Sequence, residues 1–439
     1  MIFLGVVEVL GIRQLKDLFG DLQMNKQEIQ NEAVELMKEH GRVILQWATG
    51  LGKSKAAIDI LKHLFLEYIS LETRQGTPFK VLLIVAETAH KKNWKEEFTK
   101  WKVEDYIWDK MVSVDTYASL KNHRHEHYDL IILDEGHHSN SDLRLDILED
   151  ITCDNVLVLS ATLPTNTILE LNRIFGKFVS FKVSMQQAID WGILPKPKIY
   201  LIPLKLDNTY PNQVIIEERG KDILKRRVQC SMKDRWNYLK DKFHYPNLRL
   251  EIKCTEQQKY DWFDAKIEYW RNLFMRNRST AIKNKWLQYG SQRKRYLGEL
   301  KKSQAAYLLA KLAGKRYVCF CSSIEQANEL GGENAIHSEK KKESLAIIDK
   351  FNNKEINSLY AVGMIQEGQN LTDIEAGVII QLDGQERAFV QKSGRAMRAD
   401  EPEIYIMYYK GTRDEEYLNK ALEGIDPEYI TVVNNLTEF

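Results

Sequence analysis

Short runs that are apolar at nearly every position recur along the sequence, separated by longer segments with helical spacing. Such a run predicts a parallel strand with helices on both faces, because successive side chains of a strand point to opposite faces of its sheet. The runs form two groups, so we expect two α/β lobes, each built on a parallel sheet. The first group comprises residues 43–45, 81–85, 130–133 and 156–159, and the second comprises 317–321, 359–362, 378–382 and 404–408.

The stretch between the two groups has a different composition. From Arg219 to Lys302 the chain has 23 Lys and Arg against 9 Asp and Glu, a net charge of +14 in a chain whose net charge is +1. Aromatic residues recur here with helical spacing, which favours a helical subdomain. We therefore predict a first lobe at residues 1–204, a basic helical insertion at 205–302 and a second lobe at 303–439. The charge indicates a surface that binds a polyanion, and a solvated helical face is the alternative.

Composition argues against several other classes of protein. No stretch approaches the roughly 20 apolar residues that span a bilayer, so we expect no membrane segment. The five cysteines include no Cys-x-x-Cys pair, which argues against a disulfide framework or a zinc site. This pattern favours a cytoplasmic location. His123, His125 and His127 alternate, but their polar surroundings favour a solvated loop over a metal site.

A glycine-containing loop, Ala48–Ser54, follows the first apolar run and precedes a helical pattern. Gly50 and Gly52 let backbone N–H groups wrap a phosphate without steric clashes. The helix that follows directs the positive end of its dipole at the same phosphate. We expect Lys53 to contact the β and γ phosphates of a nucleotide and Ser54 to bind Mg²⁺. The strict pattern for such a loop has glycine at position 47, where this chain has Trp47.

Two carboxylates follow the apolar run at 130–133. Asp134 lies where a second ligand to Mg²⁺ is needed, and Glu135 is placed to orient and deprotonate an attacking water. Near the other end of the chain, Arg395 and Arg398 are three residues apart and share a helix face. Guanidinium groups from a second lobe can neutralise charge on a transferring phosphoryl group. These four residues, with Lys53, are the predicted catalytic set.

Taken together and in this order, the motifs resemble those of superfamily 2 helicases of the DExH type. The resemblance extends from about Met24 to Tyr417, and it is similar in detail to Swi/Snf-like translocases and phage branched-DNA helicases. It implies two tandem RecA-like lobes that bind ATP and Mg²⁺ in the cleft between them. It also implies a bacterial or phage-infected cell as the setting. The motifs that carry it are Ala48–Ser54, Asp134–His137, Ser160–Thr162 and Gln391–Arg398.

The resemblance assigns further residues to the nucleotide site. By position, Gln30 looks like the glutamine that reads adenine, and Thr49 belongs to the phosphate loop. Gly368 and Asn370 lie in a segment that resembles the second lobe's motif coupling nucleic acid to ATP. Asn370 stands where many relatives have Asp.

The resemblance also predicts contacts with a nucleic-acid strand. Thr88 and Lys91 belong to a segment, with Asn93-Trp94 in the form found in translocases on double-stranded DNA, that resembles a strand-gripping motif. Thr116 lies in Val114–Tyr117, which resembles a further backbone-contact motif. The basic insertion adds four candidate phosphate contacts, which are Arg276, Arg278, Lys283 and Lys285.

The resulting prediction is a nucleic-acid-stimulated ATPase that moves along or remodels double-stranded or branched DNA. It acts as a monomer or as part of a larger complex. An RNA helicase using the same chemistry is one alternative. Two others are a clamp switched by ATP and the motor subunit of a restriction or repair complex.

Overall fold

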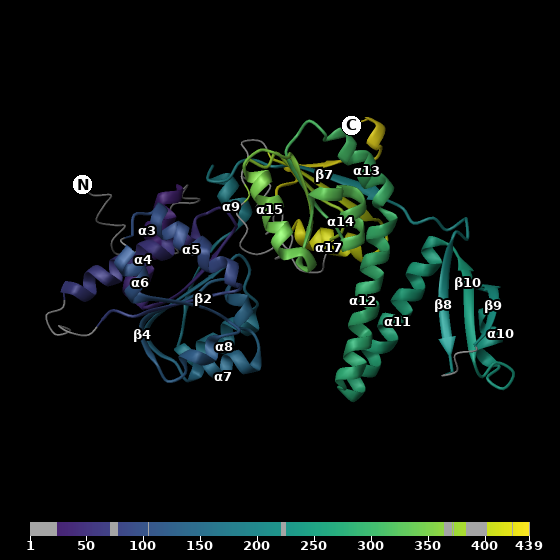
Figure 1. The fold of residues 1–439 in the computed structure, drawn as a ribbon, viewed down its shortest axis with the longest axis horizontal. Helices are drawn as coiled ribbons and strands as arrows, with labels where there is room; N and C mark the ends of the chain where they lie inside the picture. The colour runs from purple at the N-terminus through teal and green to yellow at the C-terminus, as the bar shows by residue number, and fades with distance from the viewer. Residues whose placement is uncertain are drawn as a thin grey trace.

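The computed structural model describes residues 24–70, 78–103, 105–220, 225–363, 371, 373–382, 402–423 and 425–438. They form two α/β lobes, each built on a parallel sheet, and a smaller unit that extends from the second lobe (Figure 1). The two lobes confirm the predicted fold class. Within the described residues, no helix is both long enough and apolar enough to cross a membrane.

The first lobe is a six-stranded parallel sheet in the order β3-β2-β4-β5-β1-β6. Its strands are β1 (Arg42–Trp47), β2 (Val81–Val85), β3 (Val112–Thr116), β4 (His127–Leu133), β5 (Thr152–Ser160) and β6 (Val179–Val183). Its helices are α3 (Lys26–His40), α4 (Lys53–Ser70), α5 (Thr88–Lys100), α6 (Asp105–Met111), α7 (Asp142–Glu149), α8 (Thr165–Phe175) and α9 (Met185–Asp190), with 3₁₀ turns at Leu120–His123 and Gly136–Ser139.

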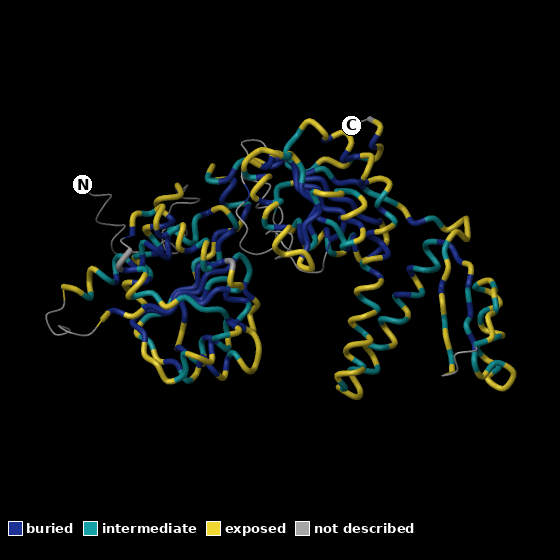
Figure 2. The backbone as a smooth tube through the Cα atoms, in the orientation of Figure 1, coloured by how far each residue is buried: buried dark blue, intermediate teal, exposed yellow. Residues whose placement is uncertain are grey.

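Each of the two faces of this sheet contributes to a separate core. Leu45 of β1 and Leu83 of β2 pack with α3, α4 and α5, whereas Ile44 and Leu82 pack with α7 and α8. Successive residues therefore enter opposite cores, which explains why these strands are apolar at every position. Figure 2 shows the buried strands at the centre of the lobe. Because all six strands are parallel, the loops that follow them lie along one edge of the sheet.

The second lobe is a seven-stranded parallel sheet in the order β12-β13-β11-β14-β15-β7-β16. Its strands are β7 (Lys198–Leu204), β11 (Tyr317–Phe320), β12 (Ala335–His337), β13 (Ser358–Val362), β14 (Ala376–Ile379), β15 (Glu403–Tyr409) and β16 (Ile430–Val432). Its helices are α13 (Lys302–Lys311), α14 (Ile324–Gly331), α15 (Lys341–Asn352) and α17 (Arg413–Ala421), with 3₁₀ turns at Gly332–Asn334, Ser338–Lys340, Pro427–Tyr429 and Leu436–Glu438.

Strand β7 belongs to the second sheet, although the sequence analysis placed residues up to 204 in the first lobe. It pairs in parallel with β15 along its whole length, from Lys198 opposite Glu403 to Leu204 opposite Tyr409. The chain therefore leaves the first sheet before β7, and the boundary at 204 is too late by the length of this strand. An apolar run predicts a strand but carries no information about which sheet the strand joins.

The insertion is only partly helical. Its second half is a long antiparallel hairpin of α11 (Glu256–Asn277) and α12 (Thr280–Leu300), as the helical spacing predicted. Its first half is a three-stranded sheet in the order β8-β10-β9, with one short helix, which corrects the all-helical prediction. These elements are β8 (Gln213–Arg219), β9 (Arg226–Ser231), α10 (Arg235–Lys240) and β10 (Leu248–Cys254). These strands are not buried on both faces, so they lack the continuous apolar runs used to predict the lobes.

A buried ion pair joins the hairpin to the second lobe. Lys301, between α12 and α13, is fully buried, and its ammonium lies 2.5 Å from Oδ2 of Asp414. The same ammonium donates to the carbonyls of Ile380 (2.8 Å) and Met407 (3.0 Å) and to Oε1 of Gln381 (3.1 Å). Burial lowers the pKa of Lys301, and the charge of Asp414 opposes that shift. The base of the hairpin is thus fixed to the carboxyl ends of β14 and β15.

Candidate functional site

The predicted phosphate loop lies between β1 and α4. Gly50 and Gly52 have φ values of 95° and 86°, in the region that favours glycine. Lys53 is the first residue of α4, and its ammonium donates to the carbonyl of Trp47 at 2.9 Å. This bond folds the lysine over its own loop. To bind a nucleotide, Lys53 would exchange that carbonyl for phosphate oxygens, and the N–H groups at the start of α4 would face the same phosphates.

Helix α3 contacts this loop through two side chains. The buried amide of Gln30 donates to the carbonyl of Leu51 at 3.4 Å, and the ammonium of Lys26 donates to the carbonyl of Gly50 at 2.9 Å. A Cβ on Gly52 would lie 2.6 Å from the Gln30 amide nitrogen, so a larger residue there would displace the Gln30 side chain. The residue predicted to read adenine is therefore adjacent to the loop predicted to bind phosphate.

Trp47, which replaces the first glycine of the strict pattern, does not disturb the loop. Its side chain is fully buried and packs edge-on against Phe181 of β6, with ring centroids 5.5 Å apart. Because Trp47 is the last residue of β1, its side chain enters the core while its carbonyl faces Lys53. The departure from the motif is thus absorbed by packing within the first lobe.

Asp134 and Glu135 follow β4 at the same edge of the sheet. Oδ2 of Asp134 accepts a hydrogen bond from the indole N–H of Trp94 at 2.8 Å, and Oδ1 accepts from the backbone N–H of Glu135 at 3.0 Å. Glu135 has φ of 48°, a conformation that non-glycine residues adopt only when the surrounding structure enforces it. A Cβ on the next residue, Gly136, would lie 2.3 Å from Val158 Cγ1, so the chain passes very close to β5.

Tyr117, like Trp94, contacts Asp134 from a distant part of the sequence. Its buried hydroxyl donates to the backbone carbonyl of Asp134 at 3.0 Å. Burial, together with the charges of Asp134 and Glu135, raises the pKa of Tyr117 well above its ordinary value, so the phenol keeps its proton. Oε2 of Glu135 lies 3.4 Å from Nδ1 of the buried His137, the histidine of the Asp-Glu-Gly-His motif.

The sequence analysis quoted Trp94 and Tyr117 only as parts of strand-contact segments and did not place either at the nucleotide site. Trp94 lies on α5 and Tyr117 directly follows β3, at separations of 40 and 17 residues from Asp134. The helical pattern of α5 could have indicated that Trp94 faces the core. It could not have indicated which polar group the indole meets there.

The three first-lobe residues predicted to contact a nucleic-acid strand lie at one edge of the sheet. Thr88 begins α5 just after β2, and Thr116 ends the neighbouring β3, where it is paired with Val85. Lys91 also lies on α5, and its ammonium is 3.1 Å from Oδ1 of Asp115. Burial by itself would raise the pKa of Asp115. Hydrogen bonds from Lys91, Thr116 and a histidine outweigh that effect and lower the pKa.

The four predicted contacts in the insertion occupy the far end of the α11–α12 hairpin. Arg276 and Arg278 lie at the end of α11, and Lys283 and Lys285 lie in the first two turns of α12. All four side chains are exposed. The tip is remote from the sheets of both lobes (Figure 1), so these cations form a group separate from Thr88, Lys91 and Thr116.

The remaining predicted residues lie outside the described part of the chain. These are Gly368 and Asn370, assigned to the coupling motif of the second lobe, and Arg395 and Arg398, assigned to the catalytic set. Thr49 and Ser54 are described, and they belong to the loop between β1 and α4 and to the first turn of α4.

The residues present fit a magnesium ion. Proteins hold Mg²⁺ through one or two carboxylates together with substrate phosphates and water, and Asp134 and Ser54 supply one carboxylate and one hydroxyl. The two carboxylate oxygens of Asp134 accept from neutral N–H donors, which leave its negative charge available to a cation. Over the residues that the structure covers, no cluster of three or more His, Cys, Asp and Glu is arranged to hold a metal. His123 contacts Tyr128 and Asp115 instead.

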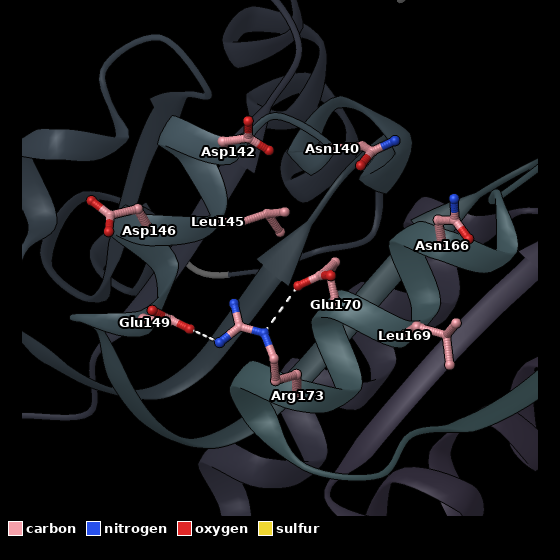
Figure 3. Close-up of a pocket in the computed structure, with 9 residues that line it drawn as sticks. All are labelled: Asn140, Asp142, Leu145, Asp146, Glu149, Asn166, Leu169, Glu170 and Arg173. Carbon is pink, nitrogen blue, oxygen red and sulfur yellow. Dashed lines mark hydrogen bonds and ion pairs between the residues drawn. The ribbon is translucent and has the colours of Figure 1, made fainter.

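A surface hollow of about 450 Å³ lies elsewhere on the first lobe, between α7 and α8 (Figure 3). Four of its lining residues are acidic, and Arg173 crosses it to contact Glu149 and Glu170. Asp142 and Asp146 complete the acidic set. Carboxylates repel phosphates, so this hollow is unsuited to a nucleotide or a nucleic-acid backbone.

Two family models match the chain in the order that the geometry suggests. The model of the type III restriction enzyme res subunit matches residues 21–165, and that of the helicase conserved C-terminal domain matches residues 300–400. The first contains the phosphate loop and the Asp134 loop, and the second covers much of the second sheet. The chain is a superfamily 2 helicase. Members of this superfamily are ATP-hydrolysing enzymes that act on nucleic acid.

Solved structures similar to this helicase share its fold at low sequence identity. Dbp5 of S. cerevisiae, bound to RNA and ADP BeF3, has a TM-score of 0.55 at 11% identity, and the match covers 93% of this helicase and 89% of Dbp5. The type ISP restriction-modification enzyme LlaBIII, bound to DNA, has a TM-score of 0.52 at 12% identity. That match covers 95% of this helicase and 31% of LlaBIII.

One curated relative is similar in sequence over a short segment. A putative ATP-dependent RNA helicase of Methanocaldococcus jannaschii is 31% identical over 99 residues, which are 23% of this helicase and 12% of that relative. This helicase therefore aligns with only a small part of the relative's length.

Proposed function

We propose that this helicase is a DNA-stimulated ATPase that moves along, or remodels, double-stranded or branched DNA. Lys53 and Ser54 bind the phosphates and the magnesium ion of ATP, Gln30 reads the adenine, and Asp134 holds the magnesium ion. Glu135 orients and deprotonates the attacking water. Arg395 and Arg398 reach the same phosphates when the second lobe closes on the first. The magnesium ion, when bound, neutralises charge on the transferring phosphoryl group.

One observation carries this proposal, namely the pair of hydrogen bonds that joins the strand-contact segments to Asp134. The indole of Trp94 comes from the helix that begins with Thr88, and the phenol of Tyr117 comes from the residue after Thr116. A nucleic-acid strand that displaces α5 or the end of β3 therefore also displaces a hydrogen-bond partner of Asp134, the proposed magnesium ligand. Coupling of this kind is what a motor stimulated by nucleic acid requires, since binding at one site must alter the other.

Support for DNA over RNA comes from resemblance. The Asn93-Trp94 form of the strand-contact segment is that of double-stranded DNA translocases, and LlaBIII, which has the same fold, was solved bound to DNA. The second candidate is an RNA helicase, because the curated relative is named as a putative RNA helicase and Dbp5 was solved bound to RNA. Both candidates use the same nucleotide site, and they differ in the nucleic acid that stimulates it.

The test measures ATPase rates of the whole chain with single-stranded, duplex and forked DNA and with structured and unstructured RNA. We expect the largest stimulation with duplex or forked DNA. Lys53→Ala and Glu135→Gln serve as inactive controls, and displacement of a triplex strand separates translocation from clamping. Stimulation by RNA alone would select the second candidate, and equal rates with and without every nucleic acid would reject both.

The cations at the hairpin tip extend the proposal to the insertion. Because each neutralised phosphate releases counterions, replacing Arg276, Arg278, Lys283 and Lys285 by Gln is expected to weaken DNA binding and flatten its salt dependence. The matched control is Gln substitution of four exposed lysines outside the insertion and outside the strand-contact segments, which are Lys177, Lys340, Lys342 and Lys350. An unchanged salt slope in the tip variant would remove the tip from the binding surface.

A further inference from the structure

Two large aromatic side chains of the insertion, close together in the sequence, are exposed to solvent. Trp236 on α10 is 66% exposed, and Phe243 in the turn that follows is 88% exposed. Several other aromatics of the insertion pack against one another, as Trp262 does with Phe263 and Phe274 with Trp286, whereas Tyr210 and Tyr269 are also exposed. Exposed aromatics on a fixed backbone commonly mark a binding site.

The backbone beneath these two rings is held by charge-assisted hydrogen bonds. The guanidinium of Arg219 donates to the carbonyls of Tyr238 (3.4 Å), Leu239 (3.0 Å), Asp241 (3.2 Å) and Tyr245 (3.1 Å). One arginine therefore ties the end of α10 to the whole turn that carries Phe243. A bond of this type is roughly twice as strong as a neutral one, so the turn is held in a defined shape at the end of β8, the strand that carries Arg219.

Helix α10 is fixed to the small sheet through the residue next to Trp236 as well. Arg235 donates two hydrogen bonds to Glu217 of β8, at 2.9 and 2.7 Å. Burial by itself would raise the pKa of Glu217. Hydrogen bonds from Arg235, Trp262 and Lys266 outweigh that effect and lower the pKa to about 2. Arg235 thus anchors α10 to the sheet next to Trp236, whose ring is exposed.

Three exposed lysines lie close to the two aromatic residues in the sequence. Lys240 follows Trp236 by four residues and shares its side of α10, Lys233 lies in the turn before α10, and Lys242 precedes Phe243. The nearby carboxylates are engaged locally, because Asp234 accepts from Ser231 at 2.6 Å and Asp241 accepts from the ring of His244 at 2.7 Å. The surface formed by Lys233, Trp236, Lys240, Lys242 and Phe243, here called the α10 surface, is therefore aromatic and cationic.

We propose that the α10 surface binds unpaired bases of a nucleic-acid strand. Trp236 and Phe243 each stack on a base, and the three lysines contact the neighbouring phosphates, which is the combination that single strands require. Helix α10 lies on the outer side of the insertion, away from both lobes (Figure 1). A strand bound there would lie away from the nucleic acid that contacts the two lobes. An unpaired arm of a branched molecule could occupy that position. This inference rests on the proposed function only in taking a nucleic acid as the ligand.

The test compares two fluorescein-labelled ligands by anisotropy, a blunt duplex and the same duplex with two unpaired oligo-dT arms. In the double variant Trp236→Ala/Phe243→Ala, we expect affinity for the forked ligand to fall at least about tenfold, because stacking on two rings is lost. Affinity for the blunt duplex is expected to stay within about twofold. Tyr210→Ala is the matched control, since Tyr210 is 72% exposed but precedes the opposite end of β8. The ring-preserving variant Trp236→Phe/Phe243→Tyr is expected to retain forked binding.

A second readout locates the contact directly. Arms that contain 5-iododeoxyuridine are irradiated on the wild-type chain, and the cross-linked peptides are expected to include Trp236 or Phe243. Unchanged forked binding in the alanine double variant, or cross-links confined to other segments, would overturn this inference and leave the α10 surface to a protein partner. ATPase stimulation of the wild-type chain is measured in parallel. If no nucleic acid stimulated the ATPase, the proposed function would be contradicted. If stimulation were seen but forked binding were unchanged in the double variant, only the role of the α10 surface would be rejected.

Discussion

Two aspartates, one in each lobe, lie beyond the carboxyl ends of parallel strands but in opposite electrostatic surroundings. Asp134, partly exposed, accepts hydrogen bonds from the indole of Trp94 and a backbone N–H. Asp414 is fully buried against the ammonium of Lys301. A carboxylate held by neutral donors keeps a charge that a metal ion can use, whereas one paired with a buried ammonium is already neutralised. The comparison separates a candidate catalytic carboxylate from a structural one.

The largest expected effect is on catalysis at Asp134. Asp134→Asn keeps the shape of the side chain but removes its charge, so we expect kcat for ATP hydrolysis to fall by about 10²–10³-fold, with little change in thermal stability. Steady-state ATPase assays and a melting curve measure the two quantities. Asp142→Asn, at an exposed carboxylate of the same lobe, is the control and should leave both unchanged. A near-normal kcat in Asp134→Asn would contradict the catalytic role assigned to Asp134.

At Asp414 the opposite result is expected. Asp414→Asn leaves the buried ammonium of Lys301 without its counter-charge, so the free energy of unfolding of the second lobe should fall by about 3–5 kcal/mol. Chemical denaturation monitors the loss. At a temperature where the variant remains folded, its kcat should stay within about twofold of the wild-type value, because in the described part of the chain the Asp414 carboxylate bonds to Lys301, Gln381 and Tyr409, none of them a predicted nucleotide-site residue. A loss of activity without a loss of stability would contradict the structural assignment.

Removing both charges of the buried pair sharpens the comparison further. Lys301→Met/Asp414→Leu replaces the pair by apolar side chains, and such replacements are often far less damaging than removal of one partner. We expect the double variant to recover about 1–2 kcal/mol relative to Asp414→Asn. Recovery should be incomplete, because the carbonyls of Ile380 and Met407 also lose their donor. A double variant less stable than the single one would indicate that the pair contributes net stability.

The smallest expected effect concerns the donors around Asp134. Trp94→Phe preserves most of the buried ring but removes the indole N–H, so we expect the Mg²⁺ concentration needed to bind a fluorescent ATP analogue to rise about tenfold. Stimulation of ATPase by DNA should fall as well. Trp108→Phe is the matched control, because Trp108 packs on Phe98 in the same region, with ring centroids 4.6 Å apart. An unchanged Mg²⁺ requirement in Trp94→Phe would show that the indole only fills space.

The lobes could be predicted from sequence more fully than the insertion could. Strands such as β2 and β4 are covered on both faces, so their apolar runs are unbroken and legible. Strand β8 has one exposed face, with Val214 and Ile216 pointing to solvent around the buried Ile215, and such a pattern is weak over seven residues. The insertion therefore looked helical throughout, and its small sheet appeared only in three dimensions.

By itself, the sequence determined the local chemistry of the nucleotide site. The order strand, Gly50-Leu51-Gly52-Lys53, helix requires only neighbouring residues, and so does the turn after β4 that carries Asp134 and Glu135. Tertiary structure decided every relation between distant residues. It placed β7 in the second sheet, paired Lys301 with Asp414, and brought the Trp94 indole to Asp134 across 40 residues. The physical reason is that strand order and core packing, which no local pattern encodes, set which side chains meet.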